Sequence, residues 1–146
     1  MARFQRQPGV YALVVKVGNT SKLKIGALGD VEFQRGYYVY AGSAMNGLAA
    51  RIARHKRKQK RVHWHIDYLL AKAELIEVIK IPTSKRLECK FSQHISGYAE
   101  SSIPGFGCSD CACSSHLYYF KHHSNIEVLK KSIKSIDKKV YFRDHS

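Results

Sequence analysis

The stretch Gly9-Val10-Tyr11-Ala12-Leu13-Val14-Val15-Lys16-Val17 is the starting point for interpreting this chain. Its apolar, largely β-branched residues follow the turn-forming pair Pro8-Gly9, which predicts a strand over 10–17. Short extended segments bounded by turn residues are expected to follow at 22–25, 31–34 and 37–41. Because the connections are too short for parallel crossovers, we predict an antiparallel meander in the first third of the chain.

From Asn46 onward the hydrophobic pattern becomes helical. Leu48, Ile52 and Ala53 mark the apolar face of a helix for which Asn46 is the expected cap. The same pattern predicts further elements, namely helices at 66–73, at 85–98 after a capping Ser84 and at 125–135, with strands at 77–81 and 117–120. The segment 99–115 is rich in Gly, Ser and Cys and is expected to be a loop. The fold class is therefore α+β, in one domain spanning residues 1–146.

The charge of the chain limits the partners to consider. Its 25 lysine and arginine residues against 11 acidic ones give a net charge of +14, which attracts polyanions. Nucleic acid is the first such partner and an anionic membrane surface the second. No segment approaches the roughly 18 apolar residues of a membrane span, and the polar residues 1–7 do not resemble a signal peptide. We expect a cytoplasmic protein without membrane association, whose cysteines are reduced.

Glu88 is the strongest candidate for a metal ligand among the acidic residues. It lies beside the apolar stripe of Leu87, Phe91 and Ile95 in the predicted helix. Magnesium usually binds one or two carboxylates and keeps several waters, so a single glutamate can hold it beside a phosphate. The alternative is that Glu88 only favours the positive end of the helix dipole.

Two tripeptides, Gly9-Val10-Tyr11 and Tyr40-Ala41-Gly42, precede Arg51, His55 and Glu88 in the chain. In order and approximate spacing, these elements resemble the GIY-YIG nuclease superfamily over roughly residues 8–95. The segments 63–68 and 104–111 resemble a compact, functionally uncharacterised branch that occurs alone or joined to base-excision repair enzymes. The resemblance implies a three-stranded antiparallel core sheet flanked by helices, with the active site on one face of the sheet.

The resemblance also implies roles for the two tyrosines. Tyr11 would be the general base or would pass the proton of water onward, and Tyr40 would orient the water or a phosphate oxygen. Gly42 would allow the backbone to turn tightly into the helix. The alternative for either tyrosine is sheet packing with the hydroxyl at the rim.

Three further residues complete the implied site. Arg51 would bind the phosphate with its forked donors, and His55 would hydrogen-bond the phosphate or Tyr11. Glu88 would hold one Mg²⁺ or Mn²⁺ ion. Arg51 and His55 are four residues apart, so they share one face of the predicted helix.

A basic run follows on the same helix. Seven of the eight residues from 54 to 61 are basic, His55 included. The six lysines and arginines are expected to contact DNA phosphates with salt-sensitive, mainly sequence-independent affinity. These residues are Arg54, Lys56, Arg57, Lys58, Lys60 and Arg61. The alternative is a solvated helix face.

Two other groups contain potential metal ligands. The first either holds a structural zinc ion or consists of reduced loop cysteines with a packed histidine. Its members are Cys108, Cys111, Cys113 and His116. The second is His63, His65 and Asp67, for which we favour a surface pair of His63 and Asp67 with His65 packed or facing a phosphate.

Together these features predict a divalent-metal-dependent endonuclease that hydrolyses phosphodiester bonds in DNA, in repair or recombination. RNA is an open alternative as substrate, and no protein partner is indicated. Two other functions stay in competition. One is a non-catalytic nucleic-acid-binding module with the same fold, and the other is a zinc-stabilised RNA-binding protein.

Overall fold

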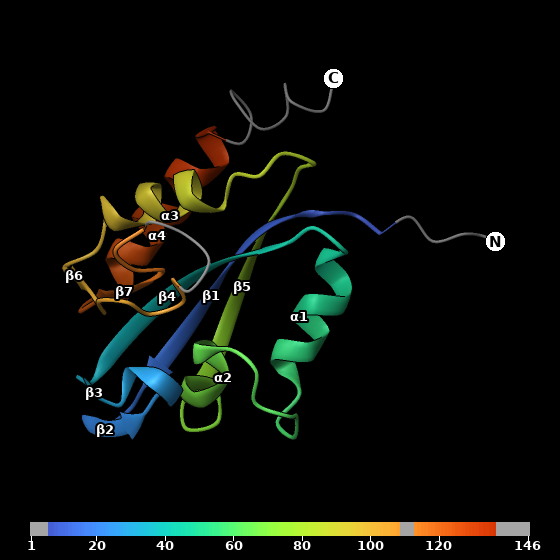
Figure 1. Cartoon of the computed structure of the whole chain (residues 1–146). Helices are drawn as coiled ribbons and strands as arrows, with labels where there is room; N and C mark the ends of the chain where they lie inside the picture. The colour runs from blue at the N-terminus through green and yellow to red at the C-terminus, as the bar shows by residue number, and fades with distance from the viewer. Residues whose placement is uncertain (1–5, 109–112, 137–146) are drawn as a thin grey trace.

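The computed structural model describes residues 6–108 and 113–136 (Figure 1). Its main sheet has five strands in the order β5-β1-β4-β7-β6, with every neighbouring pair antiparallel. The strands are β1 (Gly9–Val17), β4 (Gly36–Ala44), β5 (Glu74–Pro82), β6 (Ser101–Ser102) and β7 (Leu117–Phe120). The α-helices are α1 (Leu48–Lys56), α2 (His65–Leu70), α3 (Glu88–Ser96) and α4 (His123–Ile136). The predicted α+β class is confirmed, but five strands take the place of the three expected.

Strand β1 lies inside the sheet and is buried on both faces. It pairs along its whole length with β4 and, across an irregularity between Val14 and Val15, with β5. Residues at odd positions, such as Leu13, belong to one hydrophobic cluster, and those at even positions, such as Val10, to the other. This double burial explains why the stretch is apolar without alternation.

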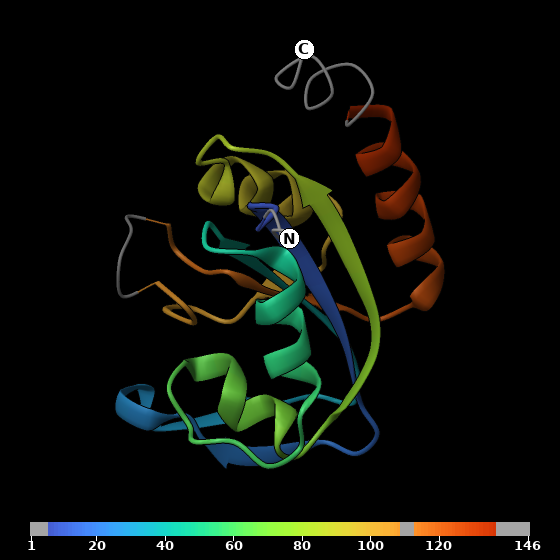
Figure 2. The same ribbon diagram turned by 90° about the vertical axis from the view of Figure 1, so that its right-hand side faces the viewer.

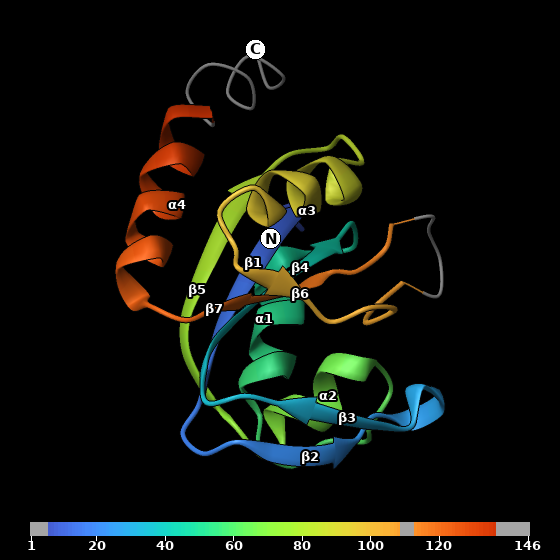
Figure 3. The ribbon, with the colours of Figure 1, turned by 90° about the vertical axis from the view of Figure 1, so that its left-hand side faces the viewer.

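Helices cover both faces of the sheet (Figures 2 and 3). One cluster contains Leu48 and Ile52 of α1 together with Ile66 and Leu69 of α2. The opposite cluster contains residues of α3 and α4, such as Phe91 and Leu129. The sheet is thus sandwiched between two layers of helix. No helix among the described residues is long and apolar enough to cross a membrane.

The predicted meander is wrong in its pairing. Strands β2 (Ser21–Lys24) and β3 (Asp30–Phe33), joined through a 3₁₀ turn η1 (Gly26–Leu28), form a separate two-stranded sheet. The chain therefore leaves the main sheet after β1 and returns at β4. Strands β2 and β3 have four residues each, whereas β4 has nine like β1, so of these three strands only β4 can pair with β1 over its whole length.

Two helix starts differ from the prediction. The cap of α1 is Gly47, with φ of 134°, and not Asn46. A glycine adopts this conformation without a steric penalty, and the amide of Leu48 donates to the Gln7 carbonyl at 2.8 Å instead of to a cap side chain. Helix α3 begins at Glu88 without a side-chain cap, and the predicted cap Ser84 lies in a turn before it, in which Thr83 Oγ1 accepts from the amide of Lys85.

The other boundaries shift by a few residues. Helix α2 ends at Leu70, three residues before the predicted end, and β5 begins at Glu74. The longer β5 follows from its pairing, since Glu74 and Leu75 lie opposite Lys16 and Val15 of β1. Within the segment predicted as a loop, residues 101–102 form the edge strand β6.

Candidate active site

A pocket of about 350 Å³ opens beside the second half of β4. It is lined by residues from β1, β4, α1 and α3, which the sheet and helix packing bring together. Four of the predicted catalytic residues are among them, namely Tyr11, Tyr40, Arg51 and Glu88. The fifth, His55, hydrogen-bonds through Nε2 to the Tyr11 hydroxyl at 2.8 Å. The structure therefore places all five residues in or directly behind one pocket.

Gly42 makes room for Tyr11. The two residues lie opposite each other in the β1–β4 pair, and a Cβ on Gly42 would come within 2.5 Å of the Tyr11 hydroxyl. This role differs from the tight turn into the helix that the sequence suggested, because Gly42 lies inside a regular strand. The missing side chain lets the phenol of Tyr11 lie over the backbone of β4, with its ring centroid 6.4 Å from that of Tyr40.

Burial keeps the Tyr11–His55 pair neutral. It raises the pKa of Tyr11 to about 12, an effect that the nearby Arg51 guanidinium opposes. It lowers the pKa of His55 to about 4, although the charge of Asp67 acts in the other direction. Among the described residues, the other ring nitrogen of His55, Nδ1, is buried without a hydrogen-bond partner. A phenol and an imidazole in this state can transfer a proton along their hydrogen bond without a resting charge.

Arg51 is held in place from two sides. Its Nη1 donates to the Ser43 carbonyl at 2.9 Å, and its guanidinium carbon lies 4.6 Å from the centroid of the Trp64 ring. The guanidinium of Arg54 lies 4.5 Å from the same ring. Such stacking fixes a guanidinium plane. Arg51 keeps most of its five donors for an anion in the pocket.

Glu88 is fixed but not enclosed. Its Oε1 accepts from Ser43 Oγ at 2.5 Å, and its Oε2 lies 3.0 Å from Nδ1 of the buried His116. Burial alone would raise the pKa of Glu88, but the hydrogen bonds from His116 and Ser43 hold it below its ordinary value. The side chain is 33% exposed, so its oxygens have lone pairs left for a cation. This donor set fits a magnesium-type ion, which needs few protein ligands.

The basic run divides into two kinds of residue. Arg54 donates to both carboxylate oxygens of Asp67 at 2.9 Å, and Lys60 Nζ donates to the His55 carbonyl at 3.0 Å. These two cations therefore hold the end of α1 and the loop behind it. The remaining members are exposed and available to a partner, namely Lys56, Arg57, Lys58 and Arg61.

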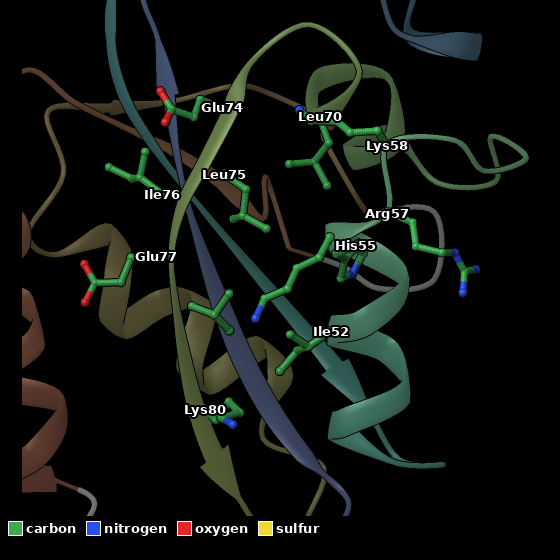
Figure 4. Close-up of a pocket in the computed structure, with 12 residues that line it drawn as sticks. Ile52, His55, Arg57, Lys58, Leu70, Glu74, Leu75, Ile76, Glu77 and Lys80 are labelled. Carbon is green, nitrogen blue, oxygen red and sulfur yellow. The ribbon is translucent and has the colours of Figure 1, made fainter.

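The exposed part of the run borders a second cavity, of about 500 Å³, between α1 and β5 (Figure 4). Arg57 and Lys58 line it together with His55, and Lys80 of β5 lies across from them. None of the six predicted nucleic-acid-binding residues lines the pocket of Tyr11. His55 lies between the two cavities, since it lines the second and hydrogen-bonds to a residue of the first.

The predicted surface pair of His63 and Asp67 is wrong. Asp67 is 1% exposed, and besides Arg54 it accepts from the backbone amides of His63 and Trp64 at 2.8 and 2.9 Å. It thus caps the first turn of α2 and binds the partly buried Arg54. His65 is packed, as one interpretation expected, with its Nδ1 accepting from the Gly107 amide at 2.9 Å.

Ser43 and His116 hold Glu88 in place, and the sequence did not predict this role for either residue. Ser43 directly follows the Tyr40-Ala41-Gly42 tripeptide, and strand alternation places its side chain on the opposite face from Gly42. This alternation within the strand could have indicated Ser43 from the sequence alone. His116 was assigned to the predicted zinc group, in which Cys111 lies outside the described residues and Cys108 donates to the Phe106 carbonyl at 3.4 Å.

Comparison with known proteins gives one result that bears on identity. Neither the curated proteins nor the solved structures contain a match to this chain. The family model described as a domain of unknown function, DUF123, matches residues 10–138, which include the main sheet from Val10 onward and all five residues at the pocket. The chain therefore belongs to the DUF123 family.

Proposed function

We propose that this protein is a divalent-metal-dependent endonuclease of the GIY-YIG type that hydrolyses phosphodiester bonds in DNA. One observation carries the proposal: Tyr11, Tyr40, Arg51 and Glu88, distant in sequence, line one pocket. Hydrolysis of a phosphodiester needs a positioned water, stabilisation of charge on the phosphoryl oxygens and an acceptor for the proton of water. The pocket offers a group for each of these needs.

In the proposed mechanism, the phosphate lies between Arg51 and Glu88. The guanidinium of Arg51 donates to the nonbridging oxygens, with its plane held by Trp64. Glu88 would hold a divalent ion, which would supply Lewis-acid stabilisation of the charge that develops on the phosphate. The Tyr40 hydroxyl, at the wall of the pocket, orients the attacking water.

The proton of that water leaves through the Tyr11–His55 pair. As the water oxygen bonds to phosphorus, its proton moves to the Tyr11 oxygen and the phenolic proton moves to His55 Nε2. The ester P–O bond breaks on the opposite side, and the leaving alkoxide takes a proton from solvent. This relay needs no free phenolate, consistent with a Tyr11 pKa of about 12. It does need the imidazole tautomer with its proton on Nδ1.

The charge of the chain supports a polyanionic substrate. The exposed Lys56 ends the helix that carries Arg51 and His55, and the exposed Arg57, Lys58 and Arg61 lie just beyond it. They would contact phosphates beyond the one that is cleaved. The assignment to DNA, and to repair or recombination, rests on the GIY-YIG resemblance of the motifs.

The test is cleavage of branched, nicked and single-stranded DNA with Mg²⁺ or Mn²⁺, using Tyr11→Phe and a matched control. Tyr38→Phe is that control, because Tyr38 is equally buried in the same sheet but bonds the Gln34 carbonyl, away from the pocket. We expect Tyr11→Phe to lower the cleavage rate by about 100-fold or more, as for loss of a positioned proton-transfer group. Tyr38→Phe should cleave at nearly the wild-type rate. Equal rates in the two variants would remove Tyr11 from the chemistry.

A non-catalytic nucleic-acid-binding module is the second candidate function. One observation favours it: the pKa values of about 12 for Tyr11 and about 4 for His55 leave this pair with neither a phenolate nor a strongly basic imidazole in the resting pocket. A protein of this kind would bind DNA in a salt-dependent way and cleave nothing on the panel with either metal. Metal-dependent cleavage that Tyr11→Phe removes would exclude it.

A further inference from the structure

A second group of metal ligands lies behind Glu88. Cys89 of α3, Cys113 and His116 each place one ligand atom within 4.8 Å of those of the other two. Cys89 and Cys113 are partly buried and His116 is fully buried. Two thiolates and an imidazole are the ligands that zinc prefers, and they are too soft for magnesium. The group is distinct from the predicted zinc set, since it includes Cys89 and does not include Cys108.

Hydrogen bonds hold the two segments of this group at a fixed separation. Ser92, one turn after Cys89 on α3, donates from Oγ to the Ser115 carbonyl at 3.1 Å. Ser92 Oγ also lies 2.5 Å from the Tyr118 hydroxyl of β7, within hydrogen-bond distance. The start of α3 and the segment leading into β7 are thus joined before any metal binds. A metal site gains affinity when its ligands are held in this way.

The orientation of His116 fits a metal ligand. Its Nδ1 lies 3.0 Å from Glu88 Oε2 and 3.2 Å from the Ala41 carbonyl oxygen. Both neighbours are acceptors, so Nδ1 carries the proton and Nε2 is the ring nitrogen with a lone pair. Histidines that bind metals usually donate their other ring N–H to a carboxylate or a backbone carbonyl, and His116 does both.

We propose that Cys89, Cys113 and His116 form a zinc-class site in which Glu88 is the carboxylate partner of His116. Binding would deprotonate both thiols and release the two protons to solvent. Three protein ligands leave the fourth position of a tetrahedral ion for a water molecule or another donor. The ion would join α3 to the segment before β7 and hold His116 toward Glu88. The site would therefore set the position of the carboxylate without touching a substrate.

The test uses the full chain, stripped with a chelator and titrated with Co²⁺ as the spectroscopic probe, and the metal content of the untreated protein. We expect about one zinc per chain in the wild type, and thiolate–cobalt charge-transfer bands with intense tetrahedral d–d bands on titration. Cys89→Ser and Cys113→Ser should each lose most of the bound metal. Cys108→Ser is the matched control and should retain it.

Two results would overturn the proposal. One is stripped wild-type protein that gives no thiolate–cobalt bands and untreated protein without zinc. The other is loss of the metal in Cys108→Ser but not in Cys89→Ser, with circular dichroism showing that both variants are folded. The cobalt titration of the wild type keeps the test valid if a cysteine variant fails to fold. Because no readout involves cleavage, the result is independent of the proposed nuclease activity.

Discussion

Asp67 and Glu88 are both acidic side chains at the edge of the core, but their surroundings differ. The carboxylate of Asp67 is fully enclosed and accepts two hydrogen bonds from Arg54 and two from backbone amides. The carboxylate of Glu88 is 33% exposed and meets one serine and one histidine. Four donors with a paired charge make Asp67 a structural residue, whereas Glu88 keeps lone pairs that face a pocket.

The carboxylates of Asp67 and Glu88 differ in the hydrogen-bond donors that surround them. A buried carboxylate costs free energy unless its oxygens are paired, and an arginine fork pairs both at once. No arginine within residues 6–108 and 113–136 forms such a fork with Glu88, and Arg51, whose charge lowers the pKa of Glu88, bonds to the Ser43 carbonyl and stacks on Trp64. A partly exposed carboxylate with unused lone pairs beside a pocket is the kind of group expected at a functional site. Substitution of each acid tests this difference between Asp67 and Glu88.

The largest effect is expected from Glu88→Gln. The amide keeps the shape of the side chain and removes its charge, so the proposed divalent ion loses its protein ligand. We expect cleavage to fall by about 1000-fold, comparable to the loss of a main transition-state contact. The rate should be measured against Glu32→Gln, which removes an exposed acid in β3. Equal rates in the two variants would contradict a metal role for Glu88.

Asp67→Asn should have the next largest effect, on stability and not only on activity. It leaves Arg54 charged and partly buried without its partner, which typically costs about 3–5 kcal/mol. The free energy of unfolding should be measured by urea titration, with the exposed Asp30→Asn as control. If Asp67→Asn were as stable as Asp30→Asn, the enclosed pair would not stabilise the fold as its geometry suggests.

The third prediction concerns the pH dependence of stability. Burial lowers the pKa of His55, and the charge of Asp67 keeps this pKa from falling further. The folded pKa of about 4 lies below the ordinary 6.5, so the unfolded chain binds a proton more strongly. Stability contributed by neutral His55 is therefore complete above about pH 6.5 and is lost as the pH falls toward 4, by about 3 kcal/mol. Unfolding free energies from pH 7 to 4 should show a shallower decline in His55→Gln than in the exposed control His122→Gln. Parallel curves would contradict a buried, neutral His55.

Local patterns predicted the elements that carry the site. The apolar run of β1 and the helical period around Leu48 and Ile52 follow from burial of their faces, and burial is encoded in residue type. The gathering of Tyr11, Arg51 and Glu88 at one pocket was predicted only through the GIY-YIG resemblance. Spacing along the chain does not determine which segments meet.

Long-range pairing explains what the sequence did not predict. Asp67 binds Arg54 because α1 and α2 pack on the same face of the sheet, which the local pattern around 63–67 does not contain. Likewise, Cys89 meets Cys113 and His116 only because α3 lies against the segment before β7. Strands β2 and β3 are too short to pair with β1 over its whole length, and they form a separate sheet. These features follow from tertiary packing and not from propensity.

The smallest effect is expected within the basic run, where the contrast between enclosed and open side chains recurs. Arg57 and Lys58 are exposed, so the double variant Arg57→Gln/Lys58→Gln should leave stability unchanged and weaken DNA binding by about tenfold at moderate salt. The slope of log Kd against log salt should fall by about 2, which corresponds to two lost phosphate contacts. Lys131→Gln, on the opposite face at α4, serves as the control and should change neither value. Arg54→Gln should instead lower the unfolding free energy, because the Arg54 guanidinium is bonded to the carboxylate of Asp67. If the double variant leaves the salt slope unchanged, the exposed residues of the basic run are a solvated surface that does not contact DNA.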